Sequence, residues 1–498
     1  MVSGEQWHDD AVRLYGILDV DPALVAEECR SRLESNDVEE RTVFAGLIVN
    51  AGQLMADRDL ILVGMKVLAS IDSPSPTDRY NHANALIALA DLDQPQAADW
   101  ISRTSKSRRT ARHAFLDVAG AEDADTDLRS QALTNLGNQL SKGRRFVEAY
   151  DRYLEALRVD PTNGVAAMNA ARELAYAIDR GLSGPIGRVA HNDLVDIAHA
   201  HLDGIEERAG SSARDLAEQL QPMDSSPTSA GDLADPPDPY EQFVVANNLH
   251  LSLGIEAQNM SLVRWDGLRI LRYAQFDLDG PDIPPVFAMF NSAKQAYILA
   301  RDLAFESLGM EEPSPAYYHD TLDYATYGPH SARLVEAFRL ATTVMDQVAV
   351  AVNEVLGEPV EPNSFYFHNY WQKPEVKAVL ADSHNSGCIA LSEIAGDWMD
   401  GIHRAKRLAR NTATHRFIVL HDAGGESRSK SSKAIDRYSV SDFLDRTIQA
   451  LQLTRAALIH FVELTAVQAA TLGDGPAVTG LVPAHHDIRG HDELDASP

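Results

Sequence analysis

The feature that most constrains the fold of this chain is the spacing of its apolar residues, which has the period of an α-helix through nearly the whole sequence. Val43 to Met55 and Asp59 to Leu68 show it in the first third. Strand-like runs are rare, and Phe417 to Leu420 is the clearest. Several amphipathic helices of this length predict an all-α fold. In the second half, helices are predicted at Val286 to Leu308, Ser331 to Leu356, His384 to Met399, Asp400 to about His415, and Ser441 to Leu464.

Residues 130–163 carry a pattern of small and large side chains that fits one helical hairpin. Gly137 and Ala149 are small enough to let two helices approach closely, and Tyr153 is large enough to fill the space between hairpins. The pattern resembles a tetratricopeptide repeat, a 34-residue unit that cannot bury its own faces alone. Degenerate neighbouring repeats are therefore expected at Tyr80 to Leu86 and at Val165 to Ile178.

The length of the chain predicts more than one domain, because 498 residues exceed one ordinary core. The best linker candidate is Gln221 to Pro239, which is rich in Pro, Ser, Asp and Gly. We predict a tetratricopeptide-like α-solenoid over residues 1–220, a linker over 221–239, a helical bundle over 240–470 and a flexible tail over 471–498.

The chain is very acidic, with a formal net charge of -29 and only nine lysines. We interpret this as a surface adapted to concentrated salt, as in halophilic archaea. The rival interpretation is an acidic mass that repels nucleic acid, which would apply at low salt. At molar salt the Debye length falls to about 3 Å, so long-range repulsion disappears. A nucleic-acid site would then have to act through close hydrogen bonds.

Other features of the sequence indicate a cytoplasmic protein. No window approaches about 18 consecutive apolar residues, so no membrane-spanning helix is expected. The N-terminus lacks the basic and apolar regions of a secretory signal. Cys29 and Cys388 lie far apart, which argues against a disulfide scaffold or a cysteine-based zinc site and fits a reducing compartment.

A basic cluster interrupts the acidic sequence near residue 410. Arg410, Asn411 and His415 are the groups needed to hold a phosphate and move a proton beside it, without a metal. In a helix, Asn411 and His415 share a face, but Arg410 lies about 140° from His415. Arg410 and His415 could therefore meet through the length of the Arg side chain, a distorted helix end, or two chains at one cleft. The cluster comprises His403, Arg404, Lys406, Arg407, Arg410, His415 and Arg416.

The spacing of Arg410 and His415 matches the Arg-X4-His motif of the HEPN superfamily (higher eukaryotes and prokaryotes nucleotide-binding domain). From roughly residue 240 to 470 the chain resembles the HEPN subfamily that has an N-terminal tetratricopeptide region. The stretches that carry this resemblance are Phe287 to Asn291 through Arg301, Asp320 to Gly328, Ala337 to Arg339, Leu408 to Asn411, and Val419 to Asp422.

The resemblance implies a helical bundle that dimerises through its motif-bearing helices. It also implies a metal-independent endoribonuclease, without cofactors, of a toxin–antitoxin or other anti-phage system. By the resemblance, His415 would transfer protons during attack of a ribose 2′-hydroxyl on phosphorus. Arg410 would bind the phosphate, and Asn411 would orient the phosphate or the His. Some members carry a Tyr two residues after the His that a partner enzyme adenylylates; here that position is Phe417, so this regulation is not expected.

Further RNA contacts are predicted from the surroundings of the motif. Arg407 and Thr414 line up with Asn411 on a helix, and the Ser/Gly-rich segment from Gly424 to Arg437 carries more cations. This segment is either a disordered surface loop or a flexible phosphate clamp. The RNA-binding candidates are Arg407, Thr414, Arg428, Lys430 and Lys433.

Simpler interpretations remain open for the same residues. His415 could satisfy carbonyls at a helix end, Arg410 could form a structural ion pair, and the basic cluster could be a solvated helix face. Two functions therefore stay open. One is an RNA-cleaving effector whose repeats serve as a sensor or partner platform. The other is a non-catalytic RNA-binding or protein-interaction module.

Overall fold

In a computed structural model of the protein, the part of the chain that is described consists of twenty α-helices, a few 3-10 turns and four short strands. This confirms the predicted all-α fold. The described residues are 3–93, 97–183, 187–224, 238–254, 266–270, 272–273, 283–309, 325–380, 384–422, 432–471 and 478–479.

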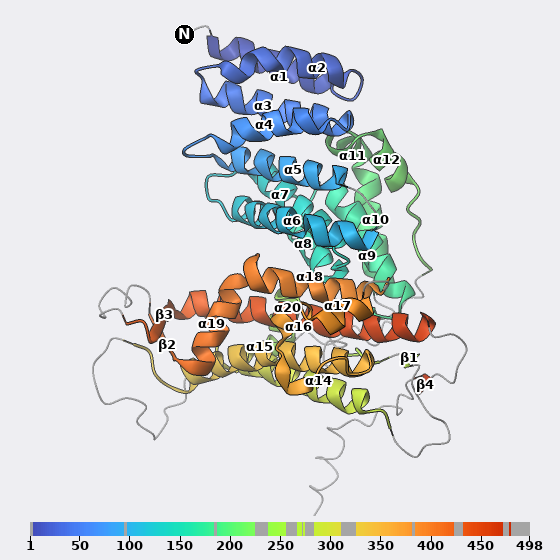
Figure 1. Ribbon diagram of the computed structural model, residues 1–498, viewed down its shortest axis with the longest axis vertical. Coiled ribbons are helices and arrows are strands. Elements are labelled where there is room, and N and C mark those ends of the chain that lie inside the picture. The colour runs from blue at the N-terminus through green and yellow to red at the C-terminus, as the bar shows by residue number, and fades with distance from the viewer. Residues whose placement is uncertain are drawn as a thin grey trace, which may run out of the picture.

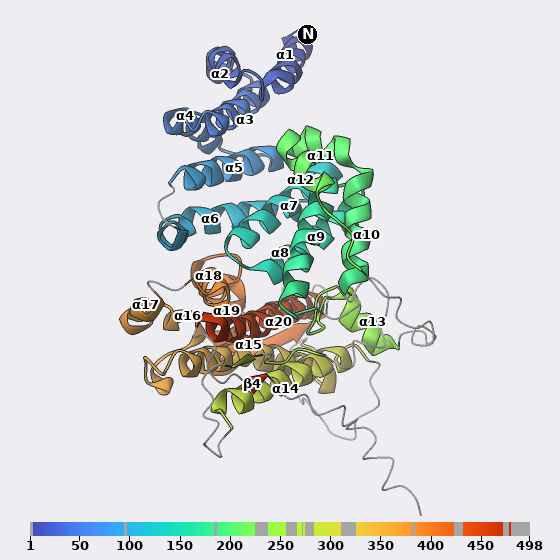
Figure 2. The same ribbon diagram turned by 90° about the vertical axis from the view of Figure 1, so that its right-hand side faces the viewer.

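The N-terminal helices stack as successive antiparallel pairs into a column, from α1 at one end to α9 beside the C-terminal helices (Figure 1). Helices α10 to α12 run along one side of this column (Figure 2). The helices are α1 (Ser3–Ile17), α2 (Pro22–Arg30), α3 (Val38–Leu54), α4 (Arg58–Ala69), α5 (Pro76–Leu92), α6 (Ala97–Ala119), α7 (Thr126–Lys142), α8 (Phe146–Val159), α9 (Gly164–Asp179), α10 (Gly187–Ala200), α11 (Leu202–Ala209) and α12 (Ser211–Glu218), with a 3-10 turn at Ser31–Glu34.

Helices α7 and α8 form the hairpin expected from residues 130–163. The Asp125 side chain caps α7 by accepting a hydrogen bond from the Leu128 backbone N–H. Arg144 turns the chain with a left-handed φ of 63°. Gly137 faces the ring of Tyr153, because a Cβ at residue 137 would lie 2.5 Å from Tyr153 Cε1. The close approach in this hairpin is thus between Gly137 and an aromatic ring on α8.

The C-terminal elements form a bundle in which α14, α15 and α20 lie side by side and α18 covers α20 (Figure 1). Gly387 permits that contact, since a Cβ there would lie 2.5 Å from the Leu464 backbone nitrogen. The elements are α13 (Pro239–Ala246), β1 (Arg272–Tyr273), α14 (Pro285–Glu306), α15 (Pro329–Val355), a 3-10 turn at Pro362–Ser364, α16 (Phe367–Tyr370), α17 (Pro374–Leu380), α18 (Ser386–Asp400), α19 (Arg404–His415), β2 (Phe417–His421), β3 (Ile435–Ser439), α20 (Val440–Thr471) and β4 (Val478–Thr479).

The strands are short and lie at the ends of the bundle. Strand β2, which includes the predicted run Phe417 to Leu420, pairs in parallel with β3, and β1 pairs antiparallel with β4. Helix α20 is long and apolar enough to cross a membrane by length and composition, but 83% of its apolar window is buried inside the protein. Burial of that kind is what a central core helix requires.

The N-terminal column of repeat helices and the C-terminal bundle share one hydrophobic core, which extends from Ala83 in α5 to Leu464 in α20. Most of the predicted linker, residues 225–237, lies outside the described residues, as does most of the predicted tail. The proposed domain boundaries therefore stay predictions. The continuous core shows that the repeat helices and the bundle are packed together rather than tethered.

Buried charges also join the two regions, at the place where α18 lies between the repeat helices and α20 (Figure 2). Asp397 on α18 is fully buried and forms ion pairs with Arg145, at the start of α8, and with Arg112 on α6. Arg455 on α20 pairs with Asp151 on α8, with 2.9 Å between Nη1 and Oδ2. A buried charge is tolerated only when it is paired, so these contacts fix the regions against each other.

Candidate functional site

The predicted motif lies on α19, and the basic residues on this short helix and directly beside it face three different surroundings. His403 and Lys406 are buried against the repeat region, where His403 Nε2 lies 3.1 Å from Glu148 Oε1. The guanidinium of Arg407 donates hydrogen bonds to the backbone carbonyls of Trp398 and Met399, at the end of α18. The basic cluster is therefore not one solvated face. Arg410, His415 and Arg416 remain beside a pocket.

This motif pocket has a volume of about 680 Å³ and brings together the three predicted catalytic residues, Arg410, Asn411 and His415. Helix α19 ends at His415, and the Arg416 backbone N–H closes its last turn on the Thr412 carbonyl. Arg410 and His415 thus line one pocket within a single chain. The pocket is lined by Tyr366, His368, Asn369, Leu408, Arg410, Asn411, Thr412, His415, Arg416 and Asp436.

Arg410 is held in place by Asp346 on α15, with which it forms an ion pair. The other carboxylate oxygen of Asp346 accepts a hydrogen bond of 2.8 Å from the Phe367 backbone N–H. The Arg410 guanidinium carbon also lies 5.5 Å from the centre of the Tyr366 ring. The Arg410 side chain is 17% exposed, so it is fixed yet reachable from the pocket. An anion that binds there must share this guanidinium with Asp346.

Asn411 and His415 are exposed, in contrast to Arg410. Within the described residues, neither the Asn411 amide nor the His415 ring makes a hydrogen bond to another side chain or to the backbone. Both therefore keep their donors and acceptors for a ligand in the pocket. The interpretation of His415 as a group that satisfies helix-end carbonyls has no contact to support it in this part of the chain.

The predicted RNA-binding residues are less available to a ligand than the motif residues are. Arg407 donates hydrogen bonds to backbone carbonyls of α18, as described above. The Thr414 hydroxyl donates to the Arg410 backbone carbonyl within the same helix. Lys433 is exposed, and its carbonyl accepts a hydrogen bond from Arg416. Arg428 and Lys430 lie outside the described residues.

Two residues that line the motif pocket, Tyr366 and His368, had no signal in the sequence, and neither had Asp346, which pairs with Arg410 beside it. Tyr366 and His368 stack with nearly parallel rings, whose centres are 6.0 Å apart. Burial, and then the charge of Arg407 and Arg410 against the opposing Asp346, lowers the pKa of His368 below its ordinary value of 6.5. A neutral imidazole therefore lies in the same pocket as His415 at neutral pH.

No group of three or more His, Cys, Asp or Glu side chains that could hold a metal ion is found among the described residues.

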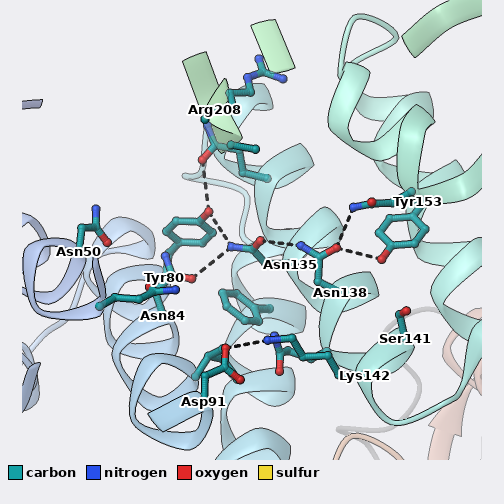
Figure 3. Close-up of a pocket in the computed structure, with 18 of the residues that line it drawn as sticks. Asn50, Tyr80, Asn84, Asp91, Asn135, Asn138, Ser141, Lys142, Tyr153 and Arg208 are labelled. Atoms are coloured by element: carbon teal, nitrogen blue, oxygen red, sulfur yellow. Dashed lines mark hydrogen bonds and ion pairs between the residues drawn. The ribbon is translucent and has the colours of Figure 1, made fainter. Parts of the chain in front are cut away.

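A second candidate site is the inner groove of the repeat column, with a volume of about 1230 Å³ (Figure 3). Four successive inner helices each place an asparagine in it. Asn50 and Asn84 are 34 residues apart in sequence, and so are Asn135 and Asn169. We call Asn50, Asn84, Asn135 and Asn169 the asparagine row. Its first two and its last two members are separated by the repeat period of 34 residues, whereas Asn84 and Asn135 are 51 residues apart.

Hydrogen bonds connect most of the asparagine row (Figure 3). Asn135 Nδ2 donates to Asn84 Oδ1 over 3.1 Å, and Asn169 Nδ2 donates to Asn138 Oδ1 over 2.9 Å. Asn138 in turn donates to Asn135. Every member of the row is partly exposed. The groove thus presents a line of fixed amides that still face solvent.

The comparisons with known proteins concern only the C-terminal part. No match was found among curated proteins or among solved structures. Residues 278–468 match the model of the LA2681-like HEPN family. They contain α14, α15, α18, α19, most of α20 and the whole motif pocket, and the match supports a HEPN domain in the C-terminal half of the chain.

Proposed function

We propose that this protein is a metal-independent endoribonuclease whose active site is the motif pocket. The observation that carries the proposal is the presence of Arg410, Asn411 and His415 around one pocket in one chain. The match of residues 278–468 to a HEPN family supports an RNA-related role. The exposed Asn411 and His415 and the anchored Arg410 are the arrangement that such chemistry needs.

In the proposed reaction, the pocket holds a phosphodiester of single-stranded RNA. Arg410 binds two phosphate oxygens through its planar guanidinium and stabilises the charge that develops in the transition state. Asp346 keeps this guanidinium oriented through their ion pair. His415 transfers a proton at a reacting oxygen, and Asn411 orients the phosphate. The adjacent ribose 2′-hydroxyl attacks phosphorus.

The test is incubation of the purified protein with total RNA in concentrated salt and a metal chelator, followed by mapping of the cut ends. Attack by the 2′-hydroxyl gives 2′,3′-cyclic phosphate and 5′-hydroxyl ends, and a substrate with a 2′-deoxy sugar at the cut position resists. RNA that is bound but stays intact would favour the alternative function, a non-catalytic RNA-binding module.

The exposed apolar residues around the motif pocket favour a homodimer through this face. Tyr366, Leu408 and Phe417 are 54%, 48% and 67% exposed, and Leu408 and Tyr366 line the pocket itself. Apolar side chains gathered on one face of a protein are typical of an interaction surface. The dimer proposed here places the two motif pockets near each other, without requiring either to be completed by the partner.

The repeat region is proposed as a partner platform of a defence or toxin–antitoxin system, with the asparagine row as its binding surface. The amide of Asn50 makes no hydrogen bond with a described residue, and that of Asn169 donates one, so these two amides can bind the N–H and C=O groups of an extended peptide. Arg144 and Arg172 line the same groove, and neither forms an ion pair with a described residue. They would attract an acidic side chain or carboxylate of the bound peptide.

A peptide array tests the platform. Parent protein in molar salt is expected to bind extended acidic peptides, and binding is expected to weaken in Asn50→Ala and Asn169→Ala. Gln219→Ala is the matched control, because Gln219 is an exposed amide that does not line the groove. Equal loss in Gln219→Ala, or no loss in either asparagine variant, would count against this surface.

A further inference from the structure

Cleavage of RNA by its own 2′-hydroxyl needs two proton transfers at two different oxygens. O2′ loses its proton to a base as it forms a bond to phosphorus. The bond from phosphorus to O5′ breaks, and O5′ takes a proton from an acid. The products are a 2′,3′-cyclic phosphate and a 5′-hydroxyl, no water is consumed, and the protons balance. One histidine serves one of these oxygens, so a second group is required.

The motif pocket holds a second imidazole besides His415. Among the residues that line it, His368 is the other histidine, and it comes from α16 whereas His415 ends α19. Tyr366 connects His368 to the phosphate-binding residue, because its ring stacks on His368 and lies 5.5 Å from the Arg410 guanidinium carbon.

Asp346 holds both Arg410 and the short helix that carries His368. One carboxylate oxygen pairs with Arg410, and the other accepts the backbone N–H of Phe367, the residue before His368. The short helix that carries His368 is therefore anchored to the same carboxylate as the proposed phosphate ligand. Asp346 is a positioning residue for both groups.

We propose that His368 is the second proton-transfer group of the motif pocket and acts as the base that accepts the 2′-hydroxyl proton, so that one chain contains the complete site. His415 then protonates the leaving O5′. This inference rests on the endoribonuclease function proposed above and adds to it a residue that the motif does not contain.

The charges that face His368 support its assignment as the base. Arg407 and Arg410 disfavour its protonated form, Asp346 favours it, and burial opposes it most. The pKa of His368 is lowered as a result, so the ring is neutral and able to accept a proton at pH 7.

The experiment compares His368→Ala and His415→Ala on two oligoribonucleotides. One has an ordinary linkage at the cut position. The other has sulfur in place of O5′, and its thiolate leaves without being protonated. Both variants are expected to lose about 10²- to 10⁴-fold in kcat on the ordinary linkage. On the sulfur linkage His415→Ala recovers and His368→Ala does not, since only the acid becomes dispensable.

A pH profile gives a second readout that a structural role would not change. The acid limb of the parent's kcat/KM, which reports groups of the free protein, is expected below the ordinary histidine pKa of 6.5, and it disappears in His368→Gln. His384→Ala is the control, because His384 is exposed and lies outside the pocket. Circular dichroism in concentrated salt checks that each variant is folded.

Complementation tests whether one chain holds the complete site. His368→Ala and His415→Ala chains, co-purified as a mixed dimer, stay inactive if both groups act in the same chain. Recovery in the mixed dimer overturns that part of the inference. His368→Ala that cuts as fast as the parent, or that recovers on the sulfur linkage, overturns the base assignment. A parent that does not cut RNA overturns the proposed function itself.

Discussion

Arg145, at the start of α8 in the repeat region, and Asp397, on α18 beside the motif helix, form an ion pair that is fully buried. Arg112 makes a second contact with Asp397 at 3.0 Å, and Glu148 pairs with Arg145. Arg145 also lies 3.1 Å from His403, the residue before α19. The helix that carries the motif is thus tied directly to the repeat helices.

Removal of one partner from this buried network is expected to destabilise the whole molecule. Asp397→Asn removes the carboxylate that Arg145 and Arg112 share and leaves each with one counter-charge, Glu148 and Glu393. Breaking a buried ion pair of this kind typically costs up to about 3–5 kcal/mol. Denaturant unfolding in concentrated salt measures the loss. Glu28→Gln is the control, because its ion pair with Arg13 is exposed and should contribute little. An Asp397→Asn protein as stable as the control would show that the junction does not depend on this charge.

The stability of the junction should depend on pH through His403. Burial lowers the pKa of His403 to about 4 from its ordinary 6.5, with Lys406 acting in the same direction and Glu148 against it. Between pH 6.5 and about 4 the unfolded chain binds a proton that the folded chain does not, so stability falls as pH falls, by at most about 1.4 kcal/mol per pH unit.

His403→Gln isolates this contribution, because Gln does not titrate. Thermal melts from pH 7 to 4.5 should show a shallower decline in His403→Gln than in the parent. His384→Gln, at an exposed position before α18, should follow the parent curve. Parallel curves for parent and His403→Gln would contradict a buried neutral imidazole.

The exposed apolar residues beside the motif predict a homodimer. Light scattering in high salt should give twice the chain mass of 54.5 kDa. Leu408→Asp and Phe417→Asp should shift the protein toward monomer, because each places a charge in the proposed interface. Val63→Asp, at an exposed apolar position on α4, should not. A parent that remains monomeric at micromolar concentration would rule out this assembly.

The net charge of -29 predicts that the fold needs salt. Unscreened repulsion among the acidic side chains destabilises the compact state at low ionic strength. Circular dichroism should show helix gained as potassium chloride rises from millimolar to molar. The buried Arg145–Asp397 pair is screened little by salt, so it should persist under these conditions. Full helicity in dilute buffer would refute the interpretation as a salt-adapted surface.

The helices were predictable because their signals are local. Residues 130–163 form α7 and α8, and Ser331 to Leu356 corresponds closely to α15. The motif was predictable for the same reason, since Arg410, Asn411 and His415 are neighbours on one helix and line one pocket.

Contacts between distant segments could not be predicted from local patterns. Asp346 is 64 residues from Arg410 in sequence, and Glu148 is 255 residues from His403. Nothing in the basic cluster distinguishes Lys406, which is buried, from Arg410, which lines the pocket. Which of these cations are buried depends on which face of α19 packs against the repeats, and the helical period of the sequence does not show which face that is.

The most direct test of the account is RNA cleavage, in chelator and concentrated salt, by the parent and by variants of α19. Arg410→Ala and His415→Ala should each lose about 10²- to 10⁴-fold in rate while remaining folded. Arg410→Lys should also fail, because an ammonium keeps the charge and loses the planar fork. Arg404→Ala is the matched control, since Arg404 is exposed on the same helix and does not line the pocket. The account predicts full activity in the parent and in Arg404→Ala alone. Cleavage by Arg410→Ala and His415→Ala at the parent rate would contradict it.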